Sequence, residues 1–212
     1  MYADGERVYA QAGALLSKTA AVACEASLTG MEFASGIPGT LGGALRMNAG
    51  AYGGEMKQIV ESAEVLTSEG EVLNLTNEEL GMGYRTSVIA KNDYVALSAV
   101  LKLEKGDRQE IRAYMEDLKE RRVTKQPLEF GSAGSTFKRP EGYFAGKLIQ
   151  DSGMQGYRVG DAQVSEKHCG FVINRGNATA AEVMQLMKDV ADRVEEKFGV
   201  RLEPEVRRIG EF

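Results

Sequence analysis

The stretch GIPGTLGGALRMNAGAYGGE, from Gly36 to Glu55, carries the strongest structural signal in this sequence of 212 residues. Eight of the 25 glycines fall between Gly30 and Gly54. Because glycine has no Cβ, such a cluster marks backbone that turns sharply or lies close against a flat partner. The stretch matches neither GxGxxG after a strand nor GxxxxGK[ST], so by itself it indicates a tight turn as readily as a ligand site.

The continuation MNAGAYGGE favours the ligand site. In it, small residues alternate with Asn48 and Tyr52, so bare backbone N–H and C=O groups are expected beside an amide side chain. A planar ring rich in hydrogen-bonding groups would fit such a surface. The stretch is therefore predicted to be a glycine-rich loop that lines part of a binding site.

Composition and charge exclude several classes of protein. A hydrophobic content of 43% suffices for a globular core, and 26 basic against 31 acidic residues, without a Lys/Arg block, argue against a nucleic-acid partner. No signal-peptide pattern and no run of about eighteen apolar residues occur, so we expect a cytoplasmic protein without membrane insertion. Two cysteines, Cys24 and Cys169, and a single histidine predict no metal site and no disulfide.

The pattern of apolar residues divides the chain near Lys105. Before it, residues 13–30 predict a helix ending near Gly30, residues 63–75 predict a hairpin around residues 68–70, and a half-buried strand is expected from Tyr94. This half is expected to be mainly sheet, joined by the glycine-rich loop.

After Lys105 the spacing of the apolar residues becomes that of an α-helix. A helix from Asp107, with Ile111, Met115, Leu118 and Arg122 on one face, must end before Pro127. Residues 147–156 predict a short helix or turn closed by glycine. Residues 169–174 indicate a buried strand, and the capping-box pattern of Thr179 and Glu182 starts a helix that runs to Gly199. The tail is expected to be an exposed or edge strand, because Pro204 cannot donate to a ladder.

Five further motifs follow the glycine-rich stretch. They are, in order, YRTS at 84–87, RRVTKQP at 121–127, GSAGSTFKRP at 131–140, AGKLIQDSGMQGYRVGDAQVSEKHCGFVIN at 145–174 and FGVRLEPEVRRIG at 198–210. Together with GIPGTLGGALRMNAGAYGGE, this order resembles the UDP-N-acetylenolpyruvoylglucosamine reductase (MurB) family over nearly the whole chain. A single glycine loop arises easily by chance, whereas this series of motifs with matching gaps does not.

The resemblance implies an α+β fold in two parts. Residues 1–105 would form the remainder of an FAD-binding domain of the vanillyl-alcohol-oxidase (PCMH) type, and residues 106–212 a MurB-type α+β substrate domain. The family normally begins with a further subdomain whose phosphate loop holds the FAD diphosphate, and nothing before Gly36 resembles it. We therefore expect an N-terminally truncated chain that binds FAD weakly or not at all and has little activity alone.

The resemblance also implies a reaction. NADPH reduces FAD, and the reduced flavin passes a hydride to the enolpyruvyl group of UDP-N-acetylglucosamine enolpyruvate, which gives UDP-N-acetylmuramate for peptidoglycan synthesis. Hydride addition puts negative charge on the carboxylate-bearing side, and that charge must be stabilised and then protonated. The chemistry therefore calls for a fixed cation, a second polar group and a proton donor.

Three residues match these catalytic roles in the family. Arg85 matches the arginine, whose guanidinium grips a carboxylate with two bonds, although an arginine by itself more often makes a surface ion pair. Ser135 matches the proton donor, with Ser132 the obvious misassignment and a turn serine the ordinary alternative. Glu205 matches the C-terminal glutamate, but strand alternation alone does not separate it from Glu203.

The resemblance assigns other residues to ligands. The positions expected to bind FAD are Gly36, Ile37, Pro38, Gly39, Thr40, Gly42, Gly43, Asn48, Ala49, Gly50 and Ala51. Those expected to contact the nucleotide-sugar substrate are Tyr84, Lys125, Arg139 and Gln163. Arg139 stands where many relatives carry asparagine, so its contact stays open, although an arginine there could reach a phosphate.

Two alternatives to the reductase remain. A related flavin oxidase would keep the glycine stretch but should lose GSAGSTFK and LEPEV, which are both present. A non-redox module would bind a nucleotide-sugar through the C-terminal half, with the glycine region purely structural. A nucleophile–base pair of His168 and Cys169 is disfavoured, because adjacent residues on a strand point to opposite faces.

Overall fold

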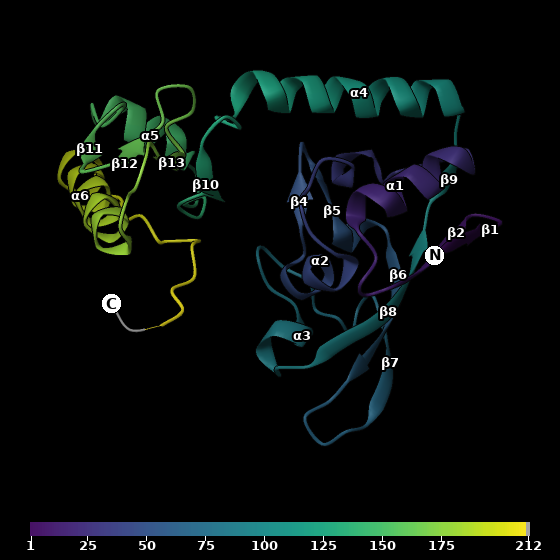
Figure 1. The fold of residues 1–212 in the computed structure, drawn as a ribbon. Helices are drawn as coiled ribbons and strands as arrows, with labels where there is room; N and C mark the ends of the chain where they lie inside the picture. The colour runs from purple at the N-terminus through teal and green to yellow at the C-terminus, as the bar shows by residue number, and fades with distance from the viewer. Residues whose placement is uncertain (211–212) are drawn as a thin grey trace. The chain divides into compact units, whose positions relative to one another are not determined.

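The structure is a computed structural model that describes residues 1–210. Its contacts divide the chain into two compact units, one from Met1 to Arg122 and one that begins at Val123. The element order is shown in Figure 1, and each unit is described by itself. The mixture of helices and antiparallel sheets in both units confirms the expected α+β class.

A five-stranded antiparallel sheet forms the centre of the first unit. Its strands, in spatial order, are β1 (Tyr2–Asp4), β2 (Arg7–Gln11), β8 (Val95–Lys102), β6 (Val60–Leu66) and β7 (Val72–Thr76). The β6–β7 connection confirms the predicted hairpin, with Gly70 at φ +86° and the Thr67 amide bonded to the Glu71 carbonyl at 2.9 Å. β8 confirms the strand expected from Tyr94.

Two helices, α1 (Leu16–Glu25) and α2 (Leu41–Met47), pack against this sheet (Figure 1). The sheet offers them a row of small residues, since Ala10 and Ala63 both lie opposite Ala99 in register and all three are buried. Small side chains let a helix approach a sheet closely. α1 ends at Glu25, short of the expected Gly30, because Ser27 takes a left-handed conformation at φ 57°.

The prediction of a loop throughout the glycine-rich stretch was wrong for α2. Thr40 caps this helix by accepting a bond from the Gly43 amide at 3.5 Å, and Leu41, Ala44 and Leu45 bury one face. That burial outweighs the low helix propensity of the two glycines within it. The stretch therefore consists of a loop, a short helix and a tight two-stranded turn.

The remaining elements of the first unit are small and connect the larger ones. They are β3 (Leu28–Thr29), η1 (Glu32–Ala34), β4 (Gly50–Ala51), β5 (Gly54–Glu55), η2 (Met56–Gln58), α3 (Val88–Lys91) and β9 (Glu104–Lys105).

Helix α4 (Arg108–Lys125) ends two residues before Pro127, as predicted. Ile111 and Leu118 are buried on the predicted face, and Met115 packs against the core of the first unit. Most of this helix accordingly belongs to the first unit, which extends past Lys105 to Arg122. The assignment of 1–105 and 106–212 as separate functional domains stays a prediction.

The second unit is built on a four-stranded antiparallel sheet with two helices. The strands, in spatial order, are β10 (Gly131–Ser135), β13 (Phe171–Asn174), β12 (Ala162–Val164) and β11 (Arg158–Val159). The helices are α5 (Ala145–Asp151) and α6 (Ala180–Phe198). The capping box of Thr179 with Glu182 and the left-handed Gly199 confirm both predicted ends of α6.

The predicted edge strand at the tail was wrong. Within residues 203–210, the pairing consists of one isolated bridge, between Pro204 and Phe137. Two main-chain bonds flank it: Lys138 N donates to Glu203 O and Glu205 N donates to Thr136 O, both at 2.8 Å. Because proline has no N–H, the pairing does not extend into a strand.

Gly54 provides a test of close packing in the glycine-rich stretch. A Cβ built on Gly54 would lie 2.5 Å from Cδ1 of the buried Phe33, so Gly54→Ala should lower the free energy of unfolding by about 1–3 kcal/mol. The matched control is Gly43→Ala, whose Cβ would be 3.8 Å from Thr40 Oγ1 inside a helix and should stabilise by up to about 1 kcal/mol. Urea denaturation of both variants measures the difference, and equal stabilities would contradict the packing argument.

Candidate active site

Arg85 lies in a tight turn of the first unit. Gly83 N donates to Thr86 O at 3.0 Å and Thr86 N donates to Gly83 O at 3.2 Å, which closes a four-residue turn with Arg85 at its third position. Arg85 has a φ of 55°, a left-handed conformation that costs an ordinary residue about 1–2 kcal/mol. Non-glycine residues in such conformations are found at sites where function requires them. The guanidinium lies 5.1 Å from the ring centroid of the exposed Tyr84.

The glycine-rich stretch presents an open surface at one end and packs against its own chain at the other. Gly36, Pro38, Gly39 and Gly43 are exposed, and a Cβ on Gly39 would meet no atom within 4 Å. By contrast, a Cβ on Gly42 would lie 2.9 Å from Ala12 Cβ. Gly39 and Gly43 are therefore open to solvent, Gly42 is required by packing, and flavin contacts along this surface stay a prediction.

Gly50, Asn48 and Ala49 also serve the packing of the first unit. A Cβ on Gly50 would lie 2.7 Å from the carbonyl oxygen of Gly54. Asn48 and Ala49 are only 2% and 7% exposed. Direct flavin contacts by these three residues stay a prediction.

Arg122 braces the same stretch from α4. Its guanidinium carbon lies 5.7 Å from the ring centroid of Tyr52, and its Nη1 would be 2.8 Å from a Cβ on Gly36. Its Nε is buried without a hydrogen-bond partner among the residues that the structure describes. The sequence placed Arg122 on the buried face of α4, but that periodicity gave no sign of its contact with the glycine-rich stretch.

Ser135 and Ser132 have different environments in the second unit. The ladder between β10 and β13 shifts register between Ser132 and Ser135, and Gly134 has a φ of 86°. Ser132 Oγ accepts from Gly134 N at 3.1 Å, so its hydroxyl stabilises this bulge. Ser135 is exposed at the end of β10, and within residues 1–210 its hydroxyl makes no hydrogen bond. β-Bulges commonly redirect side chains beside active sites.

Glu205 lies beside the residue that follows Ser135. The main-chain bond from Glu205 N to Thr136 O holds the two segments together, and Thr136 Oγ1 accepts from Val172 N at 3.0 Å. Glu205 is half-buried, whereas Glu203 is exposed and pairs with Lys138 Nζ at 3.0 Å. The two glutamates that periodicity could not separate therefore have distinct environments.

The predicted substrate residues lie in both units. Tyr84 adjoins Arg85 in the first, while Lys125, Arg139 and Gln163 belong to the second. Arg139 stacks on Phe144 at 4.0 Å and donates through Nε to Tyr143 O at 3.2 Å. Gln163 is 7% exposed and donates through Nε2 to Gly156 O at 3.1 Å, so it is more than an ordinary surface residue.

His168 and Cys169 lie in a turn, so the strand assumed for them was wrong. His168 Nδ1 accepts from Gly170 N at 3.0 Å, and its ring meets Phe171 edge-on at 5.0 Å. One part of the ring is solvent-exposed, but partial burial against Phe171 and Gly146 lowers the His168 pKa, and the positive charge of Lys125 lowers it further. Burial raises the pKa of the Cys169 thiol, which therefore stays protonated at neutral pH.

The lowered pKa of His168 predicts a pH-dependent stability. The unfolded chain gains a proton near pH 6.5 before the folded chain does, so the free energy of unfolding should decrease as pH falls below about 6.5. His168 is the only histidine, which isolates this effect from carboxylate titration at lower pH. His168→Asn keeps an acceptor for Gly170 N and should flatten the profile between pH 6.5 and 5. An unchanged slope in urea titrations of this variant would contradict the assignment.

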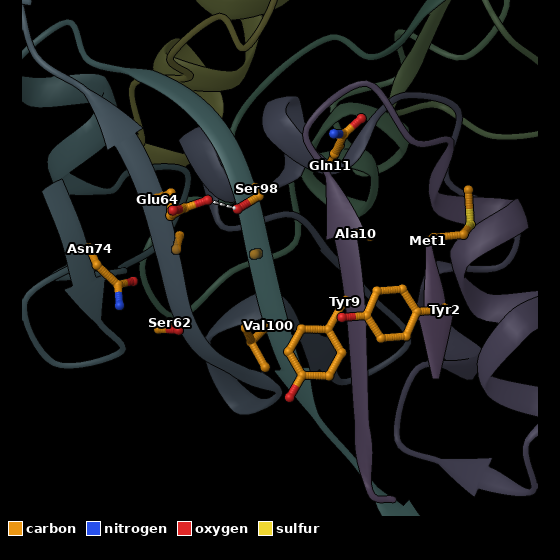
Figure 2. A pocket seen from close by; sticks show the side chains of 12 residues that line it. Met1, Tyr2, Tyr9, Ala10, Gln11, Ser62, Glu64, Asn74, Ser98 and Val100 are labelled. Carbon is orange, nitrogen blue, oxygen red and sulfur yellow. Dashed lines mark hydrogen bonds between the residues drawn. The ribbon is translucent and has the colours of Figure 1, made fainter. Parts of the chain in front are cut away.

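A hollow of about 510 Å³ lies on the five-stranded sheet (Figure 2). Tyr2 and Tyr9 stack at one side with ring centroids 4.9 Å apart, and Ser98 Oγ donates to Glu64 at the other at 2.5 Å. None of the residues predicted for catalysis, flavin or substrate lines it. The hollow is therefore separate from the candidate site.

Comparisons with known proteins agree with the two-part architecture. Residues 2–76 match the family model of an FAD binding domain, and residues 126–209 match that of the UDP-N-acetylenolpyruvoylglucosamine reductase C-terminal domain. The chain is 60% identical to the UDP-N-acetylenolpyruvoylglucosamine reductase of Agathobacter rectalis, over 97% of this chain and 65% of the relative. It is 62% identical to that of Alkaliphilus oremlandii, over 98% and 68% respectively.

A solved structure of the same enzyme family is also similar to this chain. The UDP-N-acetylenolpyruvylglucosamine reductase (MurB) of Thermus caldophilus superposes with a TM-score of 0.82 at 37% identity, covering 97% of this chain and 73% of that chain. The matches thus define a class of protein in which an FAD-binding-domain sequence is followed by the C-terminal domain sequence of this reductase family. The chain belongs to the UDP-N-acetylenolpyruvoylglucosamine reductase family, and it spans about two thirds of the length of these curated relatives.

Among the helices of residues 1–210, none combines the length and the apolar composition needed to cross a membrane.

Proposed function

We propose that this chain is the part of an NADPH-dependent flavoenzyme that reduces the enolpyruvyl group of UDP-N-acetylglucosamine enolpyruvate to UDP-N-acetylmuramate for peptidoglycan synthesis. The observation that carries the proposal is the bulge in β10, which exposes Ser135 while a main-chain bond places Glu205 beside Thr136. A cytoplasmic location, expected from the sequence, stays a prediction.

The first unit supplies the cation and the cofactor surface. When bound, FAD takes a hydride from NADPH and delivers it to the enolpyruvyl double bond. The exposed glycines at 39 and 43 leave room for the flavin ring, and Gly36 lies beside them against Arg122. Arg85 would grip the substrate carboxylate, and its permanent charge would stabilise the enolate that hydride addition creates.

The second unit supplies the proton. Ser135 would donate its hydroxyl proton to the carbon of the enolate, and Glu205 would hold the enolate or the proton in place. An ordinary serine is a weak acid, so neighbouring donors are needed to stabilise its alkoxide. Lys125 and Arg139 supply positive charge suited to the substrate diphosphate, with Gln163 and Tyr84 as further contacts.

Replacing Ser135 and Ser132 by alanine, one at a time, tests which serine is the proton donor. In the full-length, flavin-loaded protein, Ser135→Ala should slow reoxidation of the reduced flavin by the enolpyruvyl substrate about 10²–10⁴-fold, because general-acid catalysis contributes about that much. Flavin reduction by NADPH should keep its rate, since no proton from Ser135 enters that step. Stopped-flow absorbance resolves the two half-reactions.

Ser132→Ala is the matched control for that experiment. Its hydroxyl supports the bulge but has no proposed part in the proton transfer, so Ser132→Ala should slow enolpyruvyl reduction far less than Ser135→Ala does and leave flavin reduction by NADPH unchanged. A Ser135→Ala enzyme that reduces the enolpyruvyl group normally would contradict the assignment. Calorimetry with a UDP-sugar, with and without FAD, addresses the alternative of a non-redox nucleotide-sugar module, because only in a reductase should binding of one ligand depend on the other.

A further inference from the structure

Asn48 occupies a position that a glycine could fill more easily. It ends α2 in a left-handed conformation, with φ 45° and ψ 60°, and is 2% exposed. Glycine is the usual residue at such helix ends, and asparagine is the next best tolerated. The backbone conformation alone would therefore favour glycine, so the role of asparagine at this position comes from its side chain.

All of the donor capacity of Asn48 is used inside the first unit. Nδ2 donates to Glu55 Oε2 at 3.0 Å and to the carbonyl oxygen of Gly83 at 3.1 Å. Oδ1 accepts from Lys57 N at 2.8 Å. Because a carboxamide has two N–H donors, none remains for a flavin. This arrangement disfavours a flavin contact through Nδ2.

The bond to Gly83 reaches the turn that carries Arg85. The Gly83 oxygen accepts from Asn48 Nδ2 and from Thr86 N, which fixes the peptide plane that begins the turn. Arg85 itself has a φ of 55°, so the turn needs support from outside to keep this conformation. Asn48 is placed to supply that support.

A second tie holds the other side of the same turn. Ser87 is fully buried, and its hydroxyl donates to Arg46 O at 2.8 Å. Arg46 in turn donates through Nη1 to Ile89 O at 3.2 Å. The end of α2 is therefore bonded to the chain before and after Arg85.

We propose that Asn48 is a positioning residue that connects the glycine-rich stretch to Arg85 and holds its guanidinium ready for the substrate carboxylate. The proposal rests on the function proposed above for Arg85. It gives the Asn48 carboxamide a structural role in place of a flavin contact through Nδ2, and connects the glycine-rich stretch to the arginine proposed to bind the substrate carboxylate.

Hydrogen exchange tests the connection without any cofactor. Asn48→Gly keeps the left-handed backbone and removes the side-chain bonds, so exchange of the Thr86 amide should become about tenfold faster than in the control after correction for global stability. The control is Asn77→Gly, since Asn77 also donates to two carbonyls, Lys57 O at 2.8 Å and Val60 O at 2.5 Å, away from the turn. Equal exchange at Thr86 in both variants would overturn the proposal. If Asn48→Gly does not fold, Asn48→Asp keeps the size and the acceptor but, when ionised, not the donors, and the same result is expected.

A double-mutant cycle in the full-length, flavin-loaded protein tests the consequence for Arg85. Asn48→Gly should slow enolpyruvyl reduction about tenfold. In an Arg85→Ala background the same substitution should have no further effect, whereas an undiminished effect would overturn the proposal. Arg85→Ala alone tests the proposed function: full activity there would remove the catalytic role of Arg85, and hydrogen exchange would still decide whether Asn48 holds the turn.

Discussion

The close approach of backbone to backbone in the glycine-rich stretch is the constraint on which the first unit depends. Gly42 lies against Ala12, and its amide donates to the Ala12 carbonyl at 2.9 Å, so the start of α2 is fixed to the loop that precedes α1. Gly50 and Gly54 continue this contact against one another and against Phe33. Any side chain at these positions would separate the layers that place Asn48 and, through it, the Arg85 turn.

In both units the candidate catalytic residues are placed by irregular backbone. Arg85 itself adopts a left-handed conformation in its turn. Ser135 follows a bulge that is stabilised by the bond between Ser132 and Gly134. Glu205 is placed by two main-chain bonds around a proline. Regular helices and strands supply the support, because their buried faces fix the ends from which these short segments start.

The regular elements could be predicted from the sequence because their signals are local. The capping box at Thr179, the face of α4 and the hairpin around Gly70 all follow from spacing within a few residues. The helix at 41–47 was not predictable from propensity, since burial against the sheet decides it. Strand alternation likewise could not separate Glu203 from Glu205, because the difference arises from a pairing with residues some 65 positions away. The motifs selected candidate site residues, but not the contacts that position Arg85.

The way in which Glu205 is held has a consequence for how the tail can vary in evolution. Its position depends on two main-chain groups: the carbonyl oxygen of residue 203, which every amino acid provides, and the N–H of residue 205, which every amino acid except proline provides. The proline between them donates nothing. These two bonds are therefore free to form whatever side chain stands at position 203, whereas Leu202 is buried and Glu205 carries the carboxylate of the proposed site. An inserted or deleted residue between Leu202 and Glu205 has no such freedom, because it would shift the carboxylate out of step with Thr136 whatever its chemistry.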